Sequence, residues 1–317
     1  MTSMTEPLAE AGERVEPGPA AKSGEARGDG QAETWTVLGM ILWSAAYLTE
    51  KGVEHGRLDA EHLLAHALGT TRLQLYLQFE RPLDAPELAA FKPLLLRRAR
   101  REPLQYVTGR AAFRELGLAV DRRVLIPRPE TEVLVDVVLQ WARAKDDLEA
   151  LDLGTGSGCI ALALLGEGPF RRVVATDASS DALVVAEANA RAAGASDRIE
   201  LRAGALWAPL APDERFDVVV SNPPYVAEAE AAALEPEVRD WEPAPALFAG
   251  PRGVELLEAI AAGAAERLRP GGLVALEVGL GQAEAVAECV RATGAFGPPA
   301  IRRDLTGRAR IVTAQKG

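Results

Sequence analysis

Cysteine is nearly absent from this chain. Of 317 residues, two are cysteines, Cys159 and Cys289, and they lie far apart in apolar sequence. Such a content argues against a disulfide framework and against a cysteine-based metal site. Long apolar runs are also missing: none approaches the roughly 20 residues that a membrane-spanning helix needs, and the N-terminus lacks a signal pattern. We therefore expect a cytoplasmic protein with no membrane partner.

The chain also lacks an excess of basic residues. It carries 46 acidic side chains against 35 basic ones. This balance argues against a protein that holds a nucleic-acid backbone by bulk electrostatics, although a local basic patch remains possible. One basic cluster stands out, and it consists of Arg97, Arg98, Arg100 and Arg101. We interpret this cluster as a solvated helix face, with docking of an acidic partner or RNA as the alternative.

Histidine is scarce, with three residues in the whole chain. His62 and His66 are four positions apart, as metal ligands on one helix face can be, but no third ligand accompanies them. We expect no metal. Glu130 and Glu132 could serve as catalytic carboxylates, yet after Pro129 they more simply favour the positive end of a starting helix.

The residue pattern changes three times along the chain. Residues 1–33 have almost nothing to bury and are expected to form a disordered tail. Apolar residues then recur at three and four positions, which predicts a helical domain over residues 34–104. The alternating segment "ELGLAVDRRVLIPRPETE" predicts a short hairpin and linker within residues 105–128. Residues 129–317 form the large remaining domain.

This last part alternates predicted strands with alanine-rich helical segments. The strands are "LEALDLG", "RRVVATD", "RIELRAG", "FDVVVSN", "GLVALEVG" and "ARIVTA". The alternation is typical of an α/β fold with a doubly wound, mainly parallel sheet. Ligands of such sheets bind beyond the carboxyl ends of the strands, so the residues that end each strand are the candidates for function.

The first of these strands ends in a glycine-rich turn. Gly154, Gly156 and Gly158 allow the backbone to turn tightly before a helix that begins near Cys159 and directs its N–H groups at a ligand. On its own, this pattern could be simple turn chemistry. The next strand ends at Asp177, whose carboxylate could accept both hydroxyls of a ribose or could cap the following helix. Together the two features favour a nucleoside-type ligand.

The strand at residues 216–220 runs directly into Ser221, Asn222, Pro223, Pro224 and Tyr225. The prolines fix the backbone and remove two N–H donors, so acceptors predominate at this strand end. A planar NH₂ group could be held by the side-chain oxygen of Asn222 and the backbone oxygen of Pro223, with Tyr225 packed over the plane. The alternative for an isolated Asn-Pro-Pro-Tyr sequence is a plain turn.

The segments "LDLGTGSGCIALAL", "TDAS" and "SNPPYV" together resemble class I S-adenosylmethionine-dependent methyltransferases that act on planar exocyclic nitrogens. Two subgroups share the Asn-Pro-Pro-Tyr motif: adenine-N6 DNA methyltransferases and glutamine-N5 protein methyltransferases. The further segments "RREPLQYVTG", "LIPRPETE", "LEVG" and "RDLTGRARIV" resemble the release factor glutamine methyltransferase family, over about residues 36–314. The related ribosomal-protein glutamine methyltransferases share the motif but differ at "IPRPETE".

The resemblance implies a Rossmann-like methyltransferase domain whose seven-stranded sheet ends in an antiparallel strand, and an N-terminal helical domain that docks a protein substrate. The cofactor would be S-adenosyl-L-methionine, and the substrate the glutamine of the Gly-Gly-Gln loop of peptide chain release factors. Asn222 and Pro223 would be the catalytic residues, and Pro224 and Tyr225 would also contact the substrate. The implied cofactor-binding residues are Gly154, Thr155, Gly156, Ser157, Gly158, Asp177, Leu206, Trp207 and Asn222.

One position departs from the family pattern. Many members carry an acidic residue near the adenine at the end of the third strand, whereas this chain has Ala205. Leu206 or Trp207 could cover the adenine ring instead. Trp207 could equally be a core residue, because large aromatic side chains are commonly buried for packing alone.

Overall fold

The computed structural model describes residues 34–317, so the expected disordered tail at residues 1–33 lies outside the described residues. The helices that open the described chain are α1 Val37–Glu50, α2 Gly56–Ala67, α3 Arg72–Tyr76, α4 Ala85–Ala99 and α5 Leu104–Thr108. Their apolar faces meet in a separate core that includes the fully buried Ile41 and Leu64. Thr36 caps α1, and Asp84 with Glu87 forms a capping box at α4. The helical character predicted for this segment is confirmed, but α5 extends to Thr108, beyond the predicted boundary at residue 104, and Val107 belongs to the same core.

A two-stranded hairpin follows the helices, with β1 at Arg110–Phe113 and β2 at Leu116–Ala119. The hairpin therefore begins before the alternating segment from which we predicted it. Beyond residue 119, apolar and polar residues alternate in a segment without regular secondary structure, in which Val120, Val124 and Ile126 are buried. Sequence alternation alone does not distinguish such a chain from a strand.

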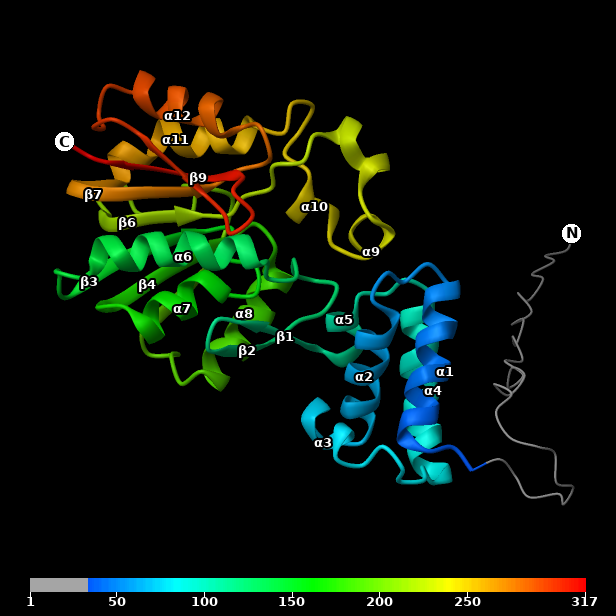
Figure 1. The fold of residues 1–317 in the computed structure, drawn as a ribbon. Helices are drawn as coiled ribbons and strands as arrows, with labels where there is room; N and C mark the ends of the chain where they lie inside the picture. Colours follow the sequence, from blue (N-terminus) through cyan, green and yellow to red (C-terminus); the bar gives the residue numbers. More distant parts are fainter. Residues whose placement is uncertain (1–33) are drawn as a thin grey trace, which may run out of the picture. The chain divides into compact units, whose positions relative to one another are not determined.

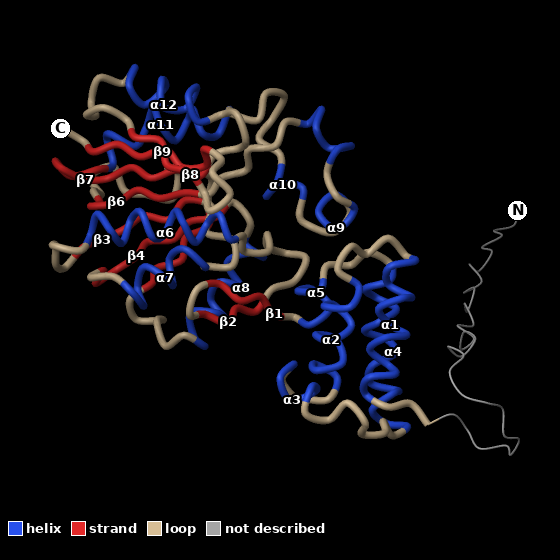
Figure 2. The backbone as a smooth tube through the Cα atoms, viewed as in Figure 1, coloured by secondary structure: helices blue, strands red, loops and turns tan. Residues whose placement is uncertain are grey.

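The rest of the described chain is a seven-stranded sheet with helices on both faces (Figures 1 and 2). Its strands are β3 Leu148–Leu153, β4 Phe170–Asp177, β5 Ile199–Ala203, β6 Phe216–Ser221, β7 Leu268–Glu277, β8 Ala300–Arg303 and β9 Ala309–Gln315. In space they run β5-β4-β3-β6-β7-β9-β8, and the last strand of the chain, β9, is antiparallel to both of its neighbours. The expected α/β architecture is confirmed.

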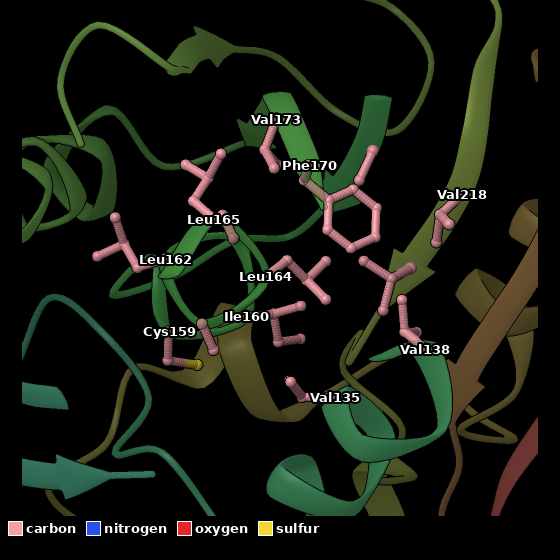
Figure 3. Close-up of a cluster of buried hydrophobic side chains, with 14 of the residues drawn as sticks. Val135, Val138, Cys159, Ile160, Leu162, Leu164, Leu165, Phe170, Val173 and Val218 are labelled. Carbon is pink, nitrogen blue, oxygen red and sulfur yellow. The ribbon is translucent and has the colours of Figure 1, made fainter. Parts of the chain in front are cut away.

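The helices divide between the two faces of this sheet. One face packs against α6 Pro129–Ala142, α7 Cys159–Glu167 and α8 Ser180–Ala192, and the other against α11 Glu255–Arg267 and α12 Ala283–Ala292. Figure 3 shows part of the first core, where Leu164 and Ile160 of α7 meet Phe170 of β4 and Val218 of β6. Each such buried side chain contributes about 1.5–3 kcal/mol. These cores hold the strand ends in place.

The connection between β6 and α11 crosses the carboxyl edge of the sheet. It contains a 3₁₀ turn, Glu228–Ala233, and two short helices, α9 Pro236–Arg239 and α10 Ala244–Leu247. The side-chain amide of Gln282 holds its first and last parts by donating to the carbonyls of Tyr225 and Gly253. None of the helices within residues 34–317 has the length and apolar character of a membrane span.

Candidate active site

Four neighbouring parallel strands bring one polar side chain each to a common edge of the sheet. Asp177 ends β4, Asp152 lies near the end of β3, Asn222 directly follows β6, and Glu277 ends β7. A cavity of about 230 Å³ opens at this edge. Its lining includes Leu125, Thr131, Gly154, Thr155, Gly156, Ser157, Asp177, Ala205, Leu206, Asn222, Pro223, Pro224, Pro245 and Ile260. The site therefore lies where doubly wound sheets bind ligands.

The glycine-rich turn forms one wall of the cavity. Gly156 has a φ of 56°, a left-handed conformation that residues with a Cβ seldom adopt, and a Cβ built there would meet open space. The turn is held from behind, because the N–H groups of Gly154 and Thr155 donate to the carbonyl of Thr176 at 2.8 and 2.9 Å. The helix that follows begins at Cys159, as the sequence predicted. This wall offers backbone and space to a ligand.

Asp177 lies half-buried beside this turn. Its Oδ2 accepts the N–H of Gly156 at 2.9 Å, and its Oδ1 accepts the N–H of Ser179 at 2.8 Å. Capping of α8 belongs to the Ser179 side chain, which accepts the N–H of Ala182 at 3.1 Å. Each carboxylate oxygen retains acceptor capacity. Asp177 is therefore fixed by the backbone and still able to accept from a ligand.

Asn222 faces the same cavity with a defined orientation. Its Nδ2 donates to the hydroxyl of Thr131 at 3.0 Å, and that hydroxyl donates to Oε2 of Glu277 at 2.7 Å. Holding the amide nitrogen on Thr131 leaves the amide oxygen to act on a ligand. Ser221, directly before it, donates to the carbonyl of Leu153 at 2.6 Å and joins the ends of β6 and β3.

Two buried carboxyl groups stand behind these residues. Glu277 is fully buried, and burial raises its pKa to about 7 against the opposing effect of its hydrogen bond from Thr131. Asp152 is fully buried as well, and burial raises its pKa to about 7 although Thr155 donates to it at 2.7 Å. Perturbed carboxyl groups of this kind cluster at functional sites more often than elsewhere in proteins.

Known families match both parts of the chain. The family described as the PrmC N-terminal domain matches residues 40–109, and the methyltransferase small domain matches residues 130–236. A release factor glutamine methyltransferase of Geobacter sulfurreducens is 45% identical over 285 residues, which cover 90% of this chain and 98% of that protein. The chain belongs to the release factor glutamine methyltransferase family.

A second relative agrees with this membership, and one solved structure shares the fold. A second release factor glutamine methyltransferase, from Chlorobaculum tepidum, is 45% identical over 78% of this chain and 87% of its own length. Among solved structures, the hMettl16 catalytic domain in complex with MAT2A 3'UTR hairpin 6 aligns with a TM-score of 0.50 at 17% identity, over 75% of this chain and 84% of that chain. That likeness concerns the fold alone.

Leu206 and Trp207 lie in different surroundings. Leu206 lines the cavity and has a φ of 48°, an unusual conformation for a bulky side chain and one that recurs at ligand sites. Trp207 is half-buried against α11, where a Cβ on Gly263 would approach its Nε1 to 2.4 Å. Of the two alternatives that the sequence left open for Trp207, the structure favours packing against α11. Ala205 and Leu206, by contrast, line the cavity.

The arginine cluster is not the solvated face that we predicted. The guanidinium of Arg98 is buried and donates to Asp59 at 2.6 Å and to Glu237 of α9 at 2.9 Å. Arg101 donates to the same Glu237 at 2.6 Å, and Arg97 donates to Glu102 at 2.9 Å. Of the four arginines, Arg100 is exposed. The prediction failed because carboxylates distant in sequence, above all Glu237, fold against these arginines.

The two carboxylates of the predicted helix start lie where that interpretation placed them. Glu130 and Glu132 lie in the first turn of α6 with Pro129 at its first position, as the helix-start interpretation required. Within residues 34–317 no group of three or more His, Cys, Asp or Glu side chains is arranged to hold a metal ion.

The sequence analysis assigned no role to three residues that the structure places at the site. Thr131, Glu277 and Asp152 all lie within segments quoted for the family resemblance, but none of them was given a role of its own. A signal for Asp152 existed, because the predicted strand carries two carboxylates, Glu149 and Asp152, among apolar residues, and a carboxylate is costly to bury without a purpose.

Proposed function

We propose that this enzyme transfers a methyl group from S-adenosyl-L-methionine to the N5 amide nitrogen of the glutamine in the Gly-Gly-Gln motif of peptide chain release factors. The observation that carries the proposal is the orientation of Asn222, whose nitrogen is held on Thr131 so that its oxygen can accept from a substrate NH₂ group. The relatives are named release factor glutamine methyltransferases, which agrees with a release factor glutamine as the substrate. Release factors act in translation, which would place the enzyme in the cytoplasm.

The cavity has the groups that S-adenosyl-L-methionine requires. The glycine turn from Gly154 to Gly158, with Thr155 and Ser157, would wrap the methionine portion, because a Cβ at Gly154 or Gly156 would meet open space. Asp177 would accept the ribose hydroxyls, and Leu206 would lie against the adenine. We leave Trp207 out of this set, since it packs on α11. The cofactor supplies a methyl group on a sulfonium, which is an electrophile.

The substrate side would be formed by the Asn-Pro-Pro-Tyr segment. An amide nitrogen is a poor nucleophile because its lone pair is delocalised. Asn222 Oδ1 and the Pro223 carbonyl would hold both amide hydrogens, with Pro224 and Tyr225 completing the substrate contacts. Holding a reacting atom in line at about 3–3.5 Å contributes on the order of 7–11 kcal/mol to rate acceleration. The same two oxygens would stabilise the positive charge that develops on nitrogen, so no strong base is required.

The helical part of the chain is proposed to dock the release factor. We propose a helical domain over residues 34–104, a hairpin and linker over residues 105–128, and the methyltransferase domain over residues 129–317. The ion pairs of Arg98 and Arg101 with Glu237 support a coupled arrangement, because they join α4 and the residues just after it to the segment that follows the Asn-Pro-Pro-Tyr motif.

Methyl incorporation tests the proposal. Purified enzyme and radiolabelled cofactor should label a release factor and should leave a release factor with Gln→Ala in its Gly-Gly-Gln motif unlabelled. Labelling of DNA at adenine, or of a ribosomal protein in preference to the release factor, would instead support the two alternatives that share the motif.

The decisive variant is Asn222→Ala. Loss of one oriented charge-stabilising contact should lower turnover by about 10²–10³-fold. Cofactor affinity, measured by calorimetry, should stay near the wild-type value, because Asp177 and the glycine turn are untouched. Asn222→Asp keeps an acceptor and should retain partial activity. A wild-type rate in Asn222→Ala with unchanged cofactor affinity would refute the mechanism.

A further inference from the structure

A chain of hydrogen bonds runs from the interior of the protein to Asn222. It begins at the buried carboxylate of Glu277, passes through the hydroxyl of Thr131, and ends at Nδ2 of Asn222, with heavy-atom distances of 2.7 and 3.0 Å. The three residues come from β7, α6 and the end of β6, and Thr131 and Glu277 are 1% and 0% exposed.

We propose that Thr131 and Glu277 are positioning residues that fix the side-chain amide of Asn222 with its oxygen toward the substrate. The inference rests on the proposed function, because it assigns a purpose to the orientation of Asn222. An asparagine amide has nearly the same shape when its oxygen and nitrogen are exchanged. The exchanged orientation would turn a donor toward the substrate NH₂ group and could not hold it.

The direction of the chain follows from its donors and acceptors. An ionised carboxylate only accepts, so the single hydrogen of the Thr131 hydroxyl points to Glu277 and its lone pairs face Asn222. Asn222 must then present its nitrogen to Thr131 and its oxygen to the cavity. A protonated Glu277 could donate to Thr131, which would release the hydroxyl hydrogen for Oδ1 of Asn222 and favour the exchanged amide.

Several neighbouring groups act on Glu277. Tyr225 reaches its Oε1 with a hydroxyl at 3.4 Å, and the charges of Arg310 on β9 and Glu130 on α6 act on it with opposite sign. Its pKa of about 7 puts its titration near neutral pH. Methylation should therefore decline as pH falls through about 7, and this decline should be weaker in Glu277→Gln, whose side chain does not titrate.

Thr131→Val tests the positioning role, because valine keeps the shape and removes the hydroxyl. We expect turnover to fall by about 10- to 100-fold, as for a misoriented contact, with cofactor affinity unchanged. Thr131→Ser restores the hydroxyl and should recover most of the rate. Glu277→Gln keeps the volume but can donate or accept, so its turnover should fall by a smaller factor, about 10-fold.

A double-mutant comparison separates positioning from general structural support. In an Asn222→Ala background the amide is gone, so adding Thr131→Val should cause no further loss of turnover. The same fold-loss in both backgrounds, or a wild-type rate in Thr131→Val, would overturn the positioning role while leaving the proposed function intact. If wild-type enzyme failed to methylate a release factor, the proposed function itself would fail before any variant was compared.

Discussion

Replacing Glu277 by glutamine should stabilise the protein at alkaline pH. The ordinary pKa of a glutamic acid side chain is 4.5, and burial raises that of Glu277 to about 7. Because each tenfold change in proton affinity is worth about 1.4 kcal/mol, ionising this group in the folded protein costs about 3 kcal/mol relative to the unfolded chain. The stability that Glu277 contributes is full below pH 4.5 and is lost as the pH rises through about 7.

Glutamine resembles the protonated carboxyl group and carries no charge at any pH. At pH 5 the free energy of unfolding of Glu277→Gln should be close to that of wild type. At pH 8 the variant should exceed wild type by about 2–3 kcal/mol. Equilibrium unfolding in urea at both pH values measures this difference. Differences between variant and wild type cancel the titration of all other groups.

The exposed Glu284 of α12 provides a matched control. Glu284→Gln removes one exposed charge from the first turn of α12, so its unfolding free energy should fall by no more than about 0.3–1 kcal/mol and should not rise at pH 8. A Glu277→Gln variant that lost stability at pH 8, or that gained equally at pH 5 and pH 8, would refute the claim that burial raises the pKa of Glu277. The same variant should be the slower methyltransferase, so stability and activity should move in opposite directions.

Two further predictions concern other parts of the site. Asp177→Ala should weaken cofactor binding by about 2–4 kcal/mol in calorimetry, because it deletes the acceptor proposed for two ribose hydroxyls; unchanged affinity would reduce Asp177 to a support of the glycine turn. Glu237→Gln should destabilise the protein by about 1–3 kcal/mol in urea, since it deprives Arg98 and Arg101 of a charged partner, whereas Glu284→Gln should cost no more than about 0.3–1 kcal/mol.

The central strands could be predicted from the sequence because they are buried on both faces. Four of the six residues in β3 and in β6 are apolar, and both strands are buried almost throughout. Six of the seven strands of the sheet were predicted, the mixed segment of β5 among them, because strand-like segments alternate with alanine-rich helical ones. The missed strand, β8, is a short edge strand with two exposed arginines. Its residues carry no local signal, because its pairing with β9 depends on the fold of the whole sheet.

The site was predicted in part, for a similar reason. The local sequence indicates the glycine turn and the asparagine before two prolines, because few other residues suit those backbone conformations. The contacts that orient Asn222 are nonlocal: Thr131 lies 91 positions away from it in sequence and 146 from Glu277. The pairing of Arg98 with Glu237 spans 139 positions and likewise leaves no trace in the spacing of residues.

On both sides of the cavity, a buried carboxyl group accepts a hydrogen bond from a threonine hydroxyl. On the cofactor side, the buried carboxyl group of Asp152 accepts from the hydroxyl of Thr155 in the glycine turn, and on the substrate side that of Glu277 accepts from Thr131. A carboxylate that only accepts determines where a neighbouring hydroxyl points, and the hydroxyl then determines what can approach its lone pairs. Burial makes each carboxylate costly to the folded state, and an aliphatic residue would cost less. Their joint presence behind the cavity is therefore better explained by orientation than by stability.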